Sequence, residues 1–85
     1  MTRDLIKDEL KVIIGDYVQE KELLKSLSES HELIADLKIN SAHIVDIVLD
    51  IEDKYDIMIE DEAIGKMGTV GESIDVIFLK LGEKK

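Results

Sequence analysis

The residues of this chain best suited to carry chemistry form one short segment, Asn40-Ser41-Ala42-His43, at the start of an apolar periodic stretch. A serine hydroxyl at a helix N-terminus, exposed beside acidic side chains, is a place where a group can be attached. A phosphodiester there would lie near free backbone amides and the positive end of the helix dipole. The alternative is structural, because Ser and Asn ahead of a helix are common N-caps. These residues alone leave both interpretations open.

Other chemistries lack the residues they need. Ala35 stands where a zinc-protease motif beginning at His31 requires its second histidine. A calcium loop beginning at Asp50 would have Tyr55 where the sharp turn needs glycine. His43 lies on a different side of the helix from Ser41 and is interpreted as an ordinary surface histidine. There is no cysteine, so disulfides and thiolate metal sites are excluded. We therefore expect no catalytic residue and no metal site.

The distribution of charge points to a class of partner. The formal net charge of −9 argues against nucleic acid, which needs clustered lysine and arginine. Residues 40–64 hold eight carboxylates and a single lysine. A basic partner surface is the natural complement of such a field. The alternative is that the charge only maintains solubility.

Length and hydropathy place the chain among small single-domain proteins. A chain of 85 residues predicts one domain, over residues 1–85. Its apolar runs are too short to span a membrane, and the charged N-terminus does not resemble a signal peptide. The expected location is the cytoplasm.

Apolar spacing predicts three substantial helices and one short helix. The first is expected from about Thr2 to Val18, and residues 19–39 form a long loop that can hold a helical turn. The second runs from about Ser41 to Lys54, and the short one from Glu60 to Lys66. The last begins at a Thr69–Glu72 capping box and ends at Gly82, before a frayed tail. The expected apolar anchors, helix by helix and in the connections, are Ile6, Leu10, Ile13, Ile14, Tyr17, Leu33, Ile34, Leu37, Ile44, Ile47, Val48, Ile51, Tyr55, Met58, Met67, Val70, Ile74, Ile77, Phe78 and Leu81.

Six blocks of this sequence resemble the acyl carrier protein family. They need no gaps from Leu33 to Ile77, and in chain order they are Lys11–Gly15, Leu33–Leu37, Asn40–Ala42, the second-helix positions Asp46, Leu49, Glu52 and Asp53, Tyr55–Glu62, and Thr69–Ile77.

The resemblance implies both fold and function. It implies an all-α, four-helix bundle of acyl-carrier type, with three long helices, one short helix and a long first loop. It implies a discrete carrier rather than an enzyme, holding acyl groups as thioesters on 4′-phosphopantetheine attached to Ser41. The implied partners are a phosphopantetheinyl transferase and acyl-processing enzymes with basic docking surfaces, in fatty-acid, lipid or related biosynthesis. A monomer is expected. The implied docking residues are Asn40, Ala42, Asp46, Leu49, Glu52 and Asp53.

Four residues around the serine depart from the family pattern. Asn40 replaces the usual Asp, Ala42 replaces Leu, His43 replaces a common acid, and Lys38 replaces a residue that is often Gly. Either the carrier serves a dedicated transferase and pathway, or it has lost modification. An unmodified acidic interaction module and a carrier of a non-fatty cargo, such as an amino acid or polyketide unit, therefore stay open as alternatives.

Overall fold

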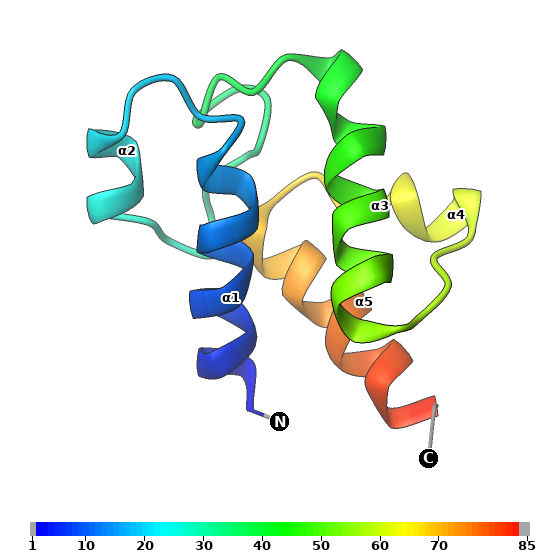
Figure 1. The fold of residues 1–85 in the computed structure, drawn as a ribbon. Coiled ribbons are helices and arrows are strands. Elements are labelled where there is room, and N and C mark those ends of the chain that lie inside the picture. Colours follow the sequence, from blue (N-terminus) through cyan, green and yellow to red (C-terminus); the bar gives the residue numbers. More distant parts are fainter. Residues whose placement is uncertain (1, 84–85) are drawn as a thin grey trace.

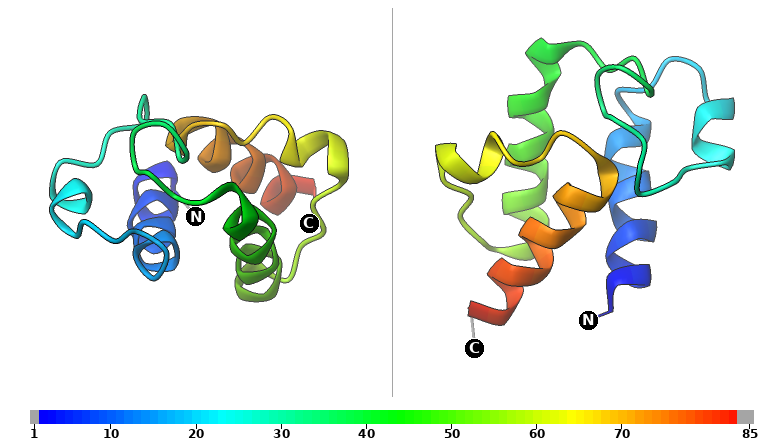
Figure 2. Two further views of the ribbon diagram at one scale, coloured as in Figure 1. Left: turned by 90° about the horizontal axis from the view of Figure 1, so that it is seen from above. Right: turned by 180° about the vertical axis from the view of Figure 1, so that it is seen from behind.

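Three long helices surround the core of the protein. The computed structural model describes residues 2–83, and the regular elements in that range are helical. α1 packs against both α3 and α5, and α5 crosses behind the other two (Figures 1 and 2). The all-α prediction is confirmed. The elements are α1 (Arg3–Gly15), α2 (Glu22–Lys25), the 3₁₀ turn η1 (Ser41–His43), α3 (Ile44–Tyr55), α4 (Asp61–Ile64) and α5 (Val70–Glu83).

The first helix is shorter than the sequence predicts. Thr2 caps it, its hydroxyl accepting a hydrogen bond from the Leu5 amide at 3.2 Å. The α-helix ends at Gly15, not Val18, because the Tyr17 amide donates to the Ile14 carbonyl at 2.9 Å and tightens the last turn. Val18 is nevertheless buried. The chain therefore leaves α1 through a compact turn that still belongs to the core.

The long loop before Ser41 is anchored by three buried apolar residues. Leu33, Leu37 and Ile39 are buried, as expected for the first two. Ile34 was expected to be an anchor and is instead exposed. The amides of residues 36 and 37 both donate to the Glu32 carbonyl, which forms a single turn. Residues 33 and 37 lie on the inner side of that turn, so Ile34 lies outside.

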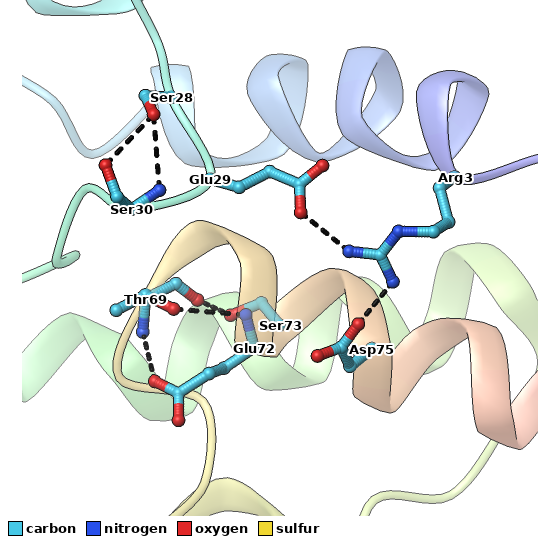
Figure 3. A network of polar contacts seen from close by, with 8 residues as sticks. All are labelled: Arg3, Ser28, Glu29, Ser30, Thr69, Glu72, Ser73 and Asp75. Carbon is cyan, nitrogen blue, oxygen red and sulfur yellow. Dashed lines mark hydrogen bonds and ion pairs between the residues drawn. The ribbon is translucent and has the colours of Figure 1, made fainter.

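The same loop is hydrogen-bonded to the segment that begins α5. The Leu33 amide donates to the Gly68 carbonyl at 3.0 Å, and the Gly71 amide donates to the Glu29 carbonyl at 2.8 Å. An isolated bridge pairs Glu32 with Thr69. Arg3 of α1 adds ion pairs to Glu29 in the loop, at 2.6 Å, and to Asp75 of α5 (Figure 3). The loop thus has a defined place although it contains only four α-helical residues.

The start of α5 matches the sequence prediction, and its end does not. The Thr69 hydroxyl accepts from the Glu72 amide, and the Glu72 carboxylate accepts from the Thr69 amide, both at 3.1 Å (Figure 3). The predicted stop at Gly82 is wrong, because the helix includes both Gly82 and Glu83. The predicted fraying of residues 84–85 lies outside the described residues.

Two further residues that the sequence predicts to be in the core lie at the surface. Phe78 is 46% exposed because, at about 100° per residue, it falls at the edge of the face formed by Ile74 and Ile77. Met58 is 80% exposed, since Ile57 and Ile59 on either side of it point inward in the connector. Met67 is buried as predicted.

No helix within residues 2–83 combines the length and apolar character that crossing a bilayer requires.

Candidate functional site

Ser41 is the first residue of a 3₁₀ turn that leads into α3. Asn40 caps this turn, its Oδ1 accepting a hydrogen bond from the Ala42 amide at 2.9 Å. The Asn40 carbonyl accepts from the His43 amide at 2.8 Å. The helical run therefore begins at Ser41 as predicted, but its first three residues are 3₁₀ and the α-helix starts at Ile44.

The Ser41 side chain is exposed and takes no part in capping. Among residues 2–83 its hydroxyl has no hydrogen-bond partner, because Asn40 supplies the cap. The expectation that the neighbouring amides are free is wrong for Ala42 and His43, which donate to Asn40. The turn therefore presents the Ser41 hydroxyl to solvent on a backbone whose conformation is fixed by hydrogen bonds.

The backbone before the turn is held by Ile39 and bent at Lys38. Ile39 is buried, and its amide donates to the Leu33 carbonyl at 3.1 Å. Lys38 has φ of 58°, in the left-handed region that favours glycine. Glycine would adopt this conformation without strain, whereas this chain has lysine there.

His43 is exposed, as predicted, but it belongs to a side-chain cluster. Its ring centroid lies 5.3 Å from that of Tyr17, and its Nδ1 lies 3.4 Å from Oδ2 of Asp46. The Tyr17 hydroxyl donates to Oδ2 of Asp50 at 2.7 Å. That hydrogen bond, with partial desolvation and nearby carboxylates, raises the pKa of Tyr17 to about 12. Tyr17 was expected only as a core residue, and local spacing gave no indication of a partner more than 25 residues away.

The predicted docking residues on α3 divide into two groups. Asp46, Leu49 and Asp53 are exposed, and Val45 is exposed beside Leu49. Glu52 is half-buried, and its Oε2 accepts a hydrogen bond from the Ile59 amide at 2.7 Å. Glu52 therefore fixes the connector after α3, a role that the sequence did not predict. The structure brings Asn40, Ser41 and Ala42 together at the N-terminal end of the same helix.

Residues 2–83 contain no group of three or more His, Cys, Asp or Glu side chains placed to hold a metal ion.

Comparisons with known proteins place the chain in a family. No family model matches it. It is 38% identical over 80 residues to an acyl carrier protein of Exiguobacterium sp., covering 91% of this chain and all of the relative. Acyl carrier proteins of Picosynechococcus sp. and Thermotoga maritima are 35% and 32% identical, over 91% and 95% of this chain and 93% and 98% of those proteins. The chain belongs to the acyl carrier protein family. Acyl carrier proteins are carriers rather than enzymes, and they usually bear phosphopantetheine.

Proposed function

We propose that this chain is a discrete carrier that holds acyl intermediates as thioesters on 4′-phosphopantetheine at Ser41. It delivers them to enzymes of fatty-acid, lipid or related biosynthesis. The observation that carries the proposal is the exposed Ser41 hydroxyl, which has no hydrogen-bond partner within residues 2–83 and lies where an acidic helix begins. In an ordinary N-cap serine, the hydroxyl oxygen would accept a hydrogen bond from a backbone amide of the following turn.

The residues around Ser41 suit attachment from coenzyme A. The serine oxygen would become the ester oxygen of a phosphodiester, its proton would pass to a base on the transferase, and the nucleotide half of coenzyme A would leave. When bound, the cofactor supplies a thiol on a long arm, which is the reactive group of the system. The chain's own part is to present that arm on a rigid turn and to bind partner enzymes.

Docking is proposed to use the exposed face of α3. Asp46 and Asp53 give this face its negative charge, and Leu49 gives it apolar area. Asn40 and Ala42 lie beside the attachment point, and the carboxylate of Glu52 contributes charge at the rim. Such a surface favours fast, electrostatically steered association with a basic transferase and basic acyl-processing enzymes. Fast exchange between partners is what a shuttle requires. We also propose that the carrier works as a monomer of one domain, residues 1–85, in the cytoplasm.

Loading with coenzyme A tests the proposal. The apo protein is incubated with coenzyme A and a broad-specificity phosphopantetheinyl transferase, and the adduct is mapped by mass spectrometry. One phosphopantetheine is expected, on Ser41, and none in Ser41→Ala. Ser26→Ala, which alters another exposed serine, is the matched control and should load normally. An adduct on a different residue, or a labelled Ser41→Ala protein, would contradict the assignment.

The departures at Asn40, Ala42 and His43 support two alternatives. One is an unmodified module that uses the acidic α3 surface alone, and the other is a carrier of a non-fatty cargo. Intact mass of the protein purified from its native host separates the three. An unmodified mass favours the module, whereas an adduct favours a carrier and its additional mass reports the cargo.

A further inference from the structure

The side chain of Tyr17 joins the end of α1 to the turn that carries Ser41. Its ring lies 5.3 Å from the ring of His43, centroid to centroid, with the planes inclined at 43°. Its hydroxyl donates to Oδ2 of Asp50 at 2.7 Å. One side chain thus contacts the last residue of η1 and the second turn of α3.

His43 is the residue through which this contact reaches Ser41. The His43 amide closes the turn on the Asn40 carbonyl at 2.8 Å, and Ser41 lies between these two residues. The upstream end of the turn is fixed by the buried Ile39. The downstream end carries an exposed imidazole, which the Tyr17 ring contacts from the turn that follows α1.

The Tyr17 hydroxyl keeps its proton at neutral pH. The bond to Asp50 is the main reason that its pKa is raised, and the charges of Asp46 and Asp16 act in the same direction. Tyr17 is therefore a constant donor in this cluster, and its link to α3 persists across the physiological pH range.

We propose that Tyr17 is a positioning residue for Ser41, holding His43 and Asp50 so that the Asn40–His43 turn keeps one orientation. This inference rests on the proposed modification of Ser41. A transferase that requires the Ser41 hydroxyl in one orientation binds only those carrier molecules whose Asn40–His43 turn has that orientation. Loss of the Tyr17 contact lowers that fraction, which raises KM and leaves kcat unchanged at saturation.

The chain supplies a matched control in its second tyrosine. The Tyr55 hydroxyl donates to Oε1 of Glu9 at 2.6 Å, so it also links α3 to α1, but from the C-terminal residue of α3. Tyr55→Phe removes a comparable hydrogen bond far from Ser41. Its effects report general loosening between α1 and α3.

The first test uses the apo protein without any transferase. Hydrogen exchange of the Ala42 and His43 amides is measured in Tyr17→Leu, Tyr17→Phe and Tyr55→Phe. Tyr17→Leu should speed exchange at both amides by about tenfold, through local opening of the turn. Tyr17→Phe, which keeps the ring against His43, should have a smaller effect, and Tyr55→Phe should have none. Equal exchange in Tyr17→Leu and Tyr55→Phe would overturn the inference.

The second test measures loading kinetics with coenzyme A and one transferase. Tyr17→Leu should raise KM several-fold with kcat nearly unchanged, and the Tyr55→Phe control should load like the wild type. His43→Ala removes the ring partner while leaving the Tyr17–Asp50 bond, and it should reproduce the KM effect. Unchanged KM in both Tyr17→Leu and His43→Ala would refute the positioning role. Failure of the wild type to load would instead refute the modification of Ser41, and the exchange test would still decide the role of Tyr17.

Discussion

At the scale of single residues, the backbone at Lys38 is the clearest departure from relaxed geometry. Lys38 and Asp56 are the non-glycine residues with positive φ in the described range, at 58° and 53°. This region crowds the Cβ atom of an L-residue against the following carbonyl. Aspartate tolerates it through local hydrogen bonding, whereas lysine has no such compensation. The strain therefore falls mainly on the residue three positions before Ser41.

Replacing Lys38 by glycine should stabilise the protein. The gain from relieving the left-handed conformation is about 1–2 kcal/mol, reduced by the greater entropy of glycine in the unfolded chain and by loss of the exposed Lys38–Glu20 pair. Lys38→Ala loses the same pair but keeps the strain. Urea unfolding should show Lys38→Gly about 1 kcal/mol more stable than Lys38→Ala. Equal stability of the two variants would mean that position 38 relaxes at no cost.

Restoring the family residues at positions 40 and 42 should speed modification. Aspartate at 40 keeps the acceptor for the Ala42 amide and adds a full charge for a basic transferase. Leucine at the exposed position 42 adds apolar area worth about 1–2 kcal/mol when a partner buries it. Asn40→Asp with Ala42→Leu should therefore load about tenfold faster with a general transferase. Equal rates would indicate that these departures do not specialise the carrier.

At the scale of elements, the start of α5 approaches the long loop too closely for any side chain at Gly71. A Cβ atom there would lie 3.0 Å from both the Cβ and the carbonyl oxygen of Glu29. Gly71→Ala should destabilise the protein by about 1–2 kcal/mol. The loop must move away from the added methyl group, yet the Glu29 carbonyl must still accept a hydrogen bond from the amide of residue 71. Gly82→Ala in the same helix meets nothing within 4 Å and should be neutral or stabilising by up to about 1 kcal/mol. Thermal unfolding of the two variants measures the difference in their stability. Similar unfolding midpoints would contradict the close approach of the loop to Gly71.

The acids of α3 should separate into docking and structural residues. Asp46→Lys with Asp53→Lys should slow association with a cognate transferase strongly, with raised salt reducing the difference, and should change folding stability little. Glu52→Ala should cost about 1–3 kcal/mol of stability, because the Ile59 amide loses its acceptor, and Glu52→Gln should restore most of it. Stopped-flow binding and urea unfolding test the two effects. If the double variant associates at the normal rate, the acidic face of α3 serves solubility and not docking.

The sequence predicted what depends on periodicity and caps, and missed what depends on distant partners. The helices, the Thr69 cap and the buried faces of α1 and α3 follow from local spacing. Met58 and Phe78 were misplaced because apolar character alone does not say which side of a connector or a helix edge is covered. The role of Glu52 and the contact of Tyr17 with His43 involve residues 7 and 26 positions apart in segments that only the fold brings together.

At the scale of the whole molecule, two tyrosine hydrogen bonds join α1 and the turn after it to α3, one at the middle of α3 and one at its C-terminal end. Tyr17 donates to Asp50 and Tyr55 donates to Glu9. The pKa of Tyr17 is raised to about 12, mainly by its hydrogen bond to Asp50, and burial raises the pKa of Tyr55 as well. Each link requires the protonated phenol, so the packing of α1 on α3 depends on pH in the alkaline range.

Alkaline pH should therefore unfold the protein through these tyrosines. A tyrosine with a raised folded-state pKa contributes stability that is complete below the unfolded value of about 10 and is lost as pH rises through the folded value. For Tyr17 this window is about pH 10 to about 12. Urea midpoints should fall across it, and Tyr17→Phe should lessen the fall. Tyrosine absorbance, which here reports only two residues, should show ionisation later in the folded than in the unfolded protein. A Tyr17→Phe protein with the same alkaline profile as the wild type would contradict the link.

The pairing of the long loop with the segment before α5 also governs how the chain can be built and divided. The Leu33 amide and the carbonyls of Glu29 and His31 find their hydrogen-bond partners in the backbone of residues 68–71. On a ribosome, the segment leading to Ser41 therefore acquires its place only after the start of the last helix has emerged. A fragment that stops before Thr69 lacks that template, so a split reporter or a shortened carrier must retain α5 to present its serine correctly.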